Sequence, residues 1–161
     1  MPTDPVLASA RDLVGESLKE RRSLIEGLPV EALNWRPAGD ATNSIAVLAT
    51  HSVYATRLWL SMAMGAPLPE RDRDSEFRAS VDDSAALPRL VDELARDCLA
   101  VLRPSEEVDW AAMRKTAGRG GDAPPEVAAA YALLHATEHL RGHVDQAGLT
   151  RRLWEARPRS P

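Results

Sequence analysis

The stretch LLHATEHLRGHVDQA, residues 133–147, combines two patterns that together indicate the fold. Its apolar residues recur at steps of three and four, which is the spacing of one face of an amphipathic helix. Its histidines, His135, His139 and His143, recur at steps of four and form a row along the same helix. At about 100° per residue, His143 and His139 border the apolar face, whereas His135 turns toward the surface. We expect a helix that packs into a core and carries imidazoles at its edge.

Three further segments show the same periodicity, so the expected helices span about 4–27, 44–64, 83–102 and 124–154. Asn43 or Ser44 can cap the second of them. The segment 70–78 is expected to be a loop, too polar for the core, and 104–124, with its run GRGGD, a long connection. No segment shows the alternation of a strand. We therefore predict an all-α four-helix bundle that occupies residues 1–161 as one domain, with a C-terminal tail from about residue 155.

Composition limits the classes of function. The 161 residues are 44% hydrophobic and carry a net charge of −4, without the basic face of a nucleic-acid binder. No apolar stretch approaches the roughly 18 residues of a membrane span, and no signal peptide is visible at the start. The single cysteine, Cys98, excludes an internal disulfide, and its place among leucines indicates a core residue. We expect a cytoplasmic protein with no nucleic-acid or membrane partner.

The fourth histidine, His51, lies on the apolar face of the segment 44–64 and points into the bundle. A lone histidine there would more often be a hydrogen-bonded core residue, but the row on the last helix favours a metal site. Residues four apart rise by about 6 Å and residues eight apart by about 12 Å, so His135 and His143 cannot easily share an ion. The predicted ligands are His51, His139 and His143. Three imidazoles leave a coordination position open, as catalytic sites do.

Other side chains have two interpretations each. His135 is either a rim residue or a proton donor or alternative ligand above the metal. Gln146 is either a surface residue or a hydrogen-bond partner of a ligand or an imidazole. Trp35 either walls the pocket or closes the end of the bundle, and Ser44 either borders the site or only caps its helix.

Two blocks of the sequence resemble the DinB-like family. They are LNWRPAGDATNSIAVLATH, residues 33–51, and HATEHLRGHVDQ, residues 135–146. The resemblance implies a four-helix bundle with a long crossover connection, a divalent metal held by three histidines and, often, a homodimer. When the family motif is matched to this sequence, the implied metal ligands are again His51, His139 and His143. Relatives commonly show H-R-G-Q where this chain has His143-Val144-Asp145-Gln146. The resemblance therefore does not define the residues at the rim of the pocket.

The resemblance also implies a class of chemistry, because characterised relatives use low-molecular-weight thiols such as mycothiol or bacillithiol. A bound cation lowers the pKa of a coordinated thiol or water. We therefore expect a thiol-dependent S-transferase that acts on a small molecule. The alternatives are a metal-dependent hydrolase and a non-catalytic stress-response bundle. Zinc is the favoured ion, with nickel, iron and manganese as alternatives. A di-iron site is excluded, because no histidine follows a glutamate by three residues.

Overall fold

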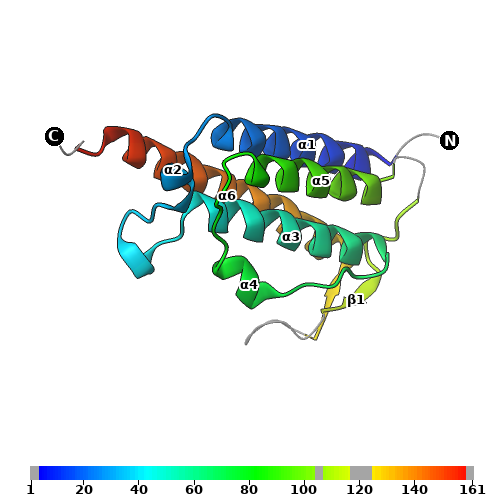
Figure 1. Ribbon diagram of the computed structural model, residues 1–161. Coiled ribbons are helices and arrows are strands. Elements are labelled where there is room, and N and C mark those ends of the chain that lie inside the picture. The colour runs from blue at the N-terminus through cyan, green and yellow to red at the C-terminus, as the bar shows by residue number, and fades with distance from the viewer. Residues whose placement is uncertain (1–3, 104–106, 117–124, 159–161) are drawn as a thin grey trace.

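The computed structural model describes residues 4–103, 107–116 and 125–158, and four long helices account for most of them (Figure 1). These are α1 (Pro5–Ile25), α3 (Ile45–Met64), α5 (Ala86–Val101) and α6 (Ala129–Ala156). α1 and α3 each pack against both α5 and α6, so the four helices enclose one core. The predicted all-α four-helix bundle is confirmed. None of the helices in these ranges combines the length and the apolar content that a membrane span requires.

The directions of the helices explain the long connection between α3 and α5. The colour gradient in Figure 1 shows that α3 and α5 run in the same direction, whereas α3 and α6 run in opposite directions. Two neighbouring helices that run the same way need a connection that returns along the bundle. Residues 65–85 make this return, and they contain the short helix α4 (Arg73–Phe77), which packs against α3.

Local sequence signals set the ends of the helices. Asp4 caps α1, because its carboxylate accepts hydrogen bonds from the backbone N–H groups of Val6 and Leu7. Ser44 caps α3 in the same way by accepting from Val47. Gly65 ends α3 with a φ of 65°, a left-handed conformation that glycine adopts without strain. The α3 boundary predicted from the sequence is therefore confirmed.

Besides α4, four elements of the described residues were not expected from the sequence. The linker after α1 contains α2 (Val30–Asn34) and a 3-10 turn at Gly39–Ala41. Two short antiparallel strands, β1 (Met113–Lys115) and β2 (Glu126–Ala128), lie near the end of α3 (Figure 1). The second strand occupies the predicted start of the last helix, so α6 begins only at Ala129. The run GRGGD lies outside the described residues.

The prediction that residues 70–78 form a loop too polar for the core is wrong. Asp72 caps α4 by accepting a hydrogen bond from the backbone N–H of Ser75. Glu76 is only 2% exposed, although six of the other eight residues in this segment are charged. A buried carboxylate needs specific partners, and it finds them at the histidine cluster.

Candidate metal centre

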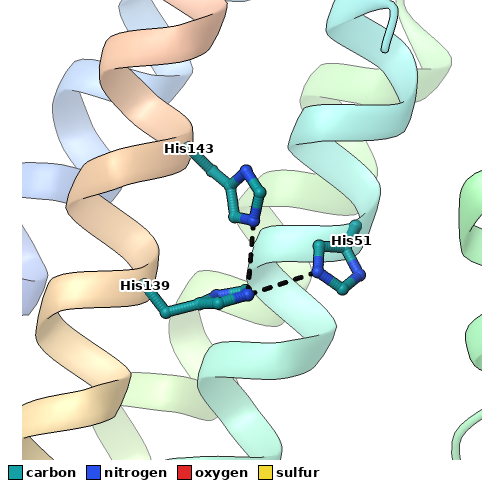
Figure 2. Close-up of side chains that lie close together, drawn as sticks. All are labelled: His51, His139 and His143. Atoms are coloured by element: carbon teal, nitrogen blue, oxygen red, sulfur yellow. Dashed lines mark hydrogen bonds between the residues drawn. The ribbon is translucent and has the colours of Figure 1, made fainter. Parts of the chain in front are cut away.

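Two of the long helices bring the histidines together. His51 lies about two turns into α3, is 5% exposed, and packs on Phe77 of α4. His139 and His143 lie one turn apart on α6, on the side that faces α3. Because α6 is the helix that packs most extensively on α3, the imidazoles meet at the helix–helix contact. Figure 2 shows the three rings pointing toward one another from the two helices.

The distances between the rings suit one ion. Nε2 of His139 lies 3.3 Å from Nε2 of His51 and 3.2 Å from Nε2 of His143. One nitrogen of each ring lies within 4.8 Å of one nitrogen of every other. Ligand nitrogens about 2.0–2.1 Å from a tetrahedral zinc ion would be about 3.3 Å apart. The two shorter separations therefore fit a three-histidine metal site.

Hydrogen bonds on the outer sides of the rings direct the lone pairs inward. Nδ1 of His51 lies 2.9 Å from a carboxylate oxygen of Glu76, and Nδ1 of His143 lies 2.9 Å from the amide oxygen of Gln146. Both acceptors assign the ring proton to Nδ1. Nε2 of each ring is then an unprotonated donor atom, as a metal ligand must be. His139 could donate a proton to only one of these two nitrogens, whereas a cation satisfies all three.

Glu76 is itself held by a buried arginine. The guanidinium of Arg71 donates to both carboxylate oxygens of Glu76, with both distances 2.6 Å, and its side chain is only 5% exposed. Burial would raise the pKa of Glu76, but the hydrogen bonds from His51 and Arg71 outweigh it and hold that pKa below its usual value. The carboxylate is therefore charged. A carboxylate behind a histidine orients the ring and makes it a stronger ligand.

The other two rings are kept neutral by their surroundings. Burial, followed by repulsion from His143 and His51, lowers the pKa of His139 to about 3. Burial also lowers the pKa of His143 to about 4, although the hydrogen bond to Gln146 opposes it. Both imidazoles are therefore unprotonated at neutral pH and available to a cation.

Nδ1 of His139 has a different environment from the Nδ1 atoms of the other two rings. It is buried and makes no hydrogen bond to any of the described residues. If this nitrogen carries the ring proton, Nε2 of His139 keeps a free lone pair. All three rings then direct a lone pair toward the centre of the cluster, where a metal ion could accept it.

The structure places the remaining sequence candidates at different distances from the histidines. His135 lies beside the site, with its ring 5.6 Å from that of His139 and 4.3 Å from that of Trp59. Trp35 instead packs edge-on against Trp154, 5.6 Å away between centroids. Trp154 lies 11 residues beyond His143, or about 16 Å along the helix axis. Trp35 thus sits toward the end of α6, away from the histidines.

Ser44 and Cys98 have structural roles. The hydroxyl of Ser44 caps α3, two turns before His51. Cys98 is fully buried, as the sequence predicts, with its sulfur 3.9 Å from the backbone oxygen of Val53. Burial raises the pKa of the thiol to about 12, so it is not a nucleophile at neutral pH.

The roles of Arg71 and Glu76, the pair that holds His51, were not predicted from the sequence. These two residues lie 20 and 25 residues after their histidine, and their spacing carries no metal-site pattern. The one available signal was Asp72, a potential cap for a short helix that contains Glu76 and Phe77.

We predict that Glu76→Gln weakens zinc binding about tenfold to a hundredfold, because the ring of His51 loses its charged partner. Glutamine keeps the size of the side chain, so the fold should persist. Competition with a chelator measures the zinc dissociation constant. Glu138→Gln is the matched control, since this glutamate is exposed and is adjacent to His139 in the sequence. Equal zinc affinity in both variants would contradict the role of Glu76.

We also predict that the metal-free protein loses stability as pH falls from 6.5 to about 4. The usual histidine pKa of 6.5 applies to the unfolded chain, whereas burial lowers the pKa values of His139 and His143 to about 3 and about 4. Below pH 6.5 the unfolded chain therefore binds more protons, and the free energy of unfolding decreases. Above pH 6.5 this contribution is fully present.

Urea unfolding at a series of pH values tests this dependence. A variant with His139→Asn and His143→Gln should show a flatter curve over the same interval, because the two titrating groups are gone. Identical slopes for the two proteins would show that these imidazoles do not carry the effect.

Comparison with known proteins now identifies the chain. No curated protein matches it. A solved structure described as the conserved protein of a locus from Enterococcus faecalis has the same fold, with a TM-score of 0.72 at 15% identity, over 93% of this chain and 97% of that one. The family model of the DinB superfamily matches residues 16–147, which include all four histidines and most of the bundle. The chain belongs to the DinB superfamily.

Proposed function

We propose that this protein is a metal-dependent S-transferase that joins the sulfur of an intact low-molecular-weight thiol to a carbon atom of a small electrophilic substrate. The observation that carries the proposal is the convergence of the imidazoles of His51, His139 and His143 on one point. The three imidazoles would hold a divalent ion, which would offer an open coordination position and lower the pKa of a thiol or water bound there. Zinc suits this donor set, as do nickel and iron.

The residues around the histidines support binding of a small molecule. Trp59 and Tyr131 lie beside His135, with ring centroids 4.3 and 5.9 Å from it, and form an aromatic wall next to the cluster. Burial lowers the pKa of His135, against an opposing effect of Glu138. His135 is therefore neutral at neutral pH and able to accept the proton of an incoming thiol. The thiolate would then attack the electrophilic carbon, and the leaving group would depart with the bonding electron pair.

Glu76 and Arg71 contribute rigidity. The Arg71–Glu76–His51 chain links α4 to α3, so the return connection between α3 and α5 braces one ligand of the site. A ligand that keeps its orientation without the ion spends less binding energy on ordering.

We predict that His139→Ala removes most of the metal, whereas His135→Ala retains it. His139 is the central ring, with its Nε2 within 3.3 Å of both others, while His135 belongs to the rim. Elemental analysis of protein purified without a histidine tag measures the metal-to-protein ratio and identifies the ion. An equal loss from both substitutions would show that the ligand set is wrong.

Cobalt substitution tests the thiol chemistry. Binding of a thiolate to cobalt produces an intense charge-transfer absorption in the near ultraviolet, and we expect this band on addition of a small thiol near neutral pH. Wild-type protein loaded with cobalt is compared with the His139→Ala variant as the control. A loaded protein that shows no band with any small thiol would refute the transferase. Hydrolysis of small esters or amides would then favour the hydrolase, and inactivity the non-catalytic bundle.

We further propose a homodimer. The groove between α1 and α6 is lined by three exposed apolar side chains: Leu13, Tyr131 and Leu134, which are 55%, 51% and 66% exposed. A contiguous apolar strip of this kind favours contact with another surface.

We predict that sedimentation at micromolar concentration yields twice the monomer mass of 17.5 kDa. Leu134→Glu should shift the protein to the monomer, because a charge would be buried at the contact. Leu68→Glu, at an exposed leucine outside the groove, is the control. A wild-type mass of one chain would refute the dimer.

A further inference from the structure

Arg21 is a buried cation without a partner. It lies on the inner face of α1 and is 0% exposed. Its three guanidinium nitrogens are buried and make no hydrogen bond to any residue in the described ranges. By contrast, the buried guanidinium of Arg71 donates hydrogen bonds to both carboxylate oxygens of Glu76. Arginine is rarely fully buried unless it is paired.

The charge of Arg21 persists at neutral pH. Burial and the nearby charge of Arg141 lower its pKa to about 9, which still leaves the guanidinium protonated. Arg141 has the same sign and is itself bonded to Glu20 and Asp145 on the surface. An unpaired buried ion is strongly destabilising. Selection for stability alone would favour an apolar residue at this position, so the arginine needs another explanation.

The position of Arg21 relates it to the histidine cluster. α1 packs alongside α6, and two contacts bracket Arg21 along this interface: Glu20 bonds to Arg141, and Leu24 packs at Gly148. His143 lies on α6 between these two contacts. The charge of Arg21 is one of the influences that lower the pKa of His143. The guanidinium of Arg21 therefore lies in the bundle interior, near the histidine cluster.

We propose that Arg21 binds an anionic group, such as a carboxylate, of the small molecule that occupies the three-histidine centre. The inference rests on the proposed metal site, because a divalent ion next to a guanidinium would place two positive charges in the interior and increase the need for an anion. An anion shared by both satisfies each of them. The guanidinium has no contact with bulk water, whereas His139 and His143 are only partly buried. The anion would therefore enter through the histidine centre.

Binding of acetate and acetamide to zinc-loaded protein tests the proposal, because the two probes have the same shape and differ in charge. Isothermal titration gives the preference for acetate over acetamide. This preference should fall about tenfold or more in Arg21→Met, since a charge-assisted hydrogen bond is lost. Arg21→Lys should retain part of it. Arg89→Met, which removes an exposed arginine paired with Asp83, is the control and should leave the preference unchanged. An unaltered preference in Arg21→Met would overturn the proposal.

Thermal unfolding of the metal-free protein provides a second readout. Methionine at position 21 removes an unpaired charge, so Arg21→Met should unfold at a higher temperature than the wild type. Acetate should raise the unfolding temperature of the wild type but not of this variant. A variant that is less stable or fails to fold would show that the guanidinium has a structural partner, which overturns the proposal. A wild type that binds no zinc would refute the metal site, and the acetate effect on unfolding would then decide the role of Arg21.

Discussion

The antiparallel packing of α3 against α6 is the constraint on which the site depends. It sets His51 opposite the turn between His139 and His143, so that residues 88 and 92 positions apart in the chain share one centre. A shift of one residue along either helix would rotate an imidazole by about 100° away from the others. The contact is supported by apolar side chains of the shared core on both helices, among them Ala49 and Leu140, which are fully buried. The core therefore positions the polar centre.

The interior of the bundle holds its polar groups in two different ways. At His51 the buried polar groups have partners, because the carboxylate of Glu76 pairs with both the imidazole and the guanidinium of Arg71. At His139 and Arg21 such partners are missing. Nδ1 of His139 and the guanidinium of Arg21 are buried and make no hydrogen bond in the described part of the chain. Most buried polar groups in folded proteins have a hydrogen-bond partner, so a buried group without one calls for an explanation. The contrast supports the proposal that His51 is preorganised and that Arg21 faces a bound anion.

The return connection between α3 and α5 has a role beyond topology. Its length is required because α3 and α5 run in the same direction (Figure 1). The chain uses this length to carry α4, whose Glu76 reaches back to His51 and whose Phe77 packs on the same ring. A segment of nine residues with seven charges thus supplies the most buried carboxylate of the site. The average polarity of this segment did not predict the burial of Glu76, because the burial of one side chain depends on the partners that it contacts.

Much of this molecule follows from local patterns in the sequence. The spacing of apolar residues predicts the four long helices, Ser44 and Gly65 predict the ends of α3, and the angular positions of His51, His139 and His143 predict their grouping. These features depend on the helical repeat, which is a property of neighbouring residues. The start of α6, the two short strands, the pairing of Arg71 with Glu76 and the isolation of Arg21 depend on which distant segments meet. Only the tertiary structure decides these, because the energy of a buried charge is determined by neighbours that lie far away in the chain.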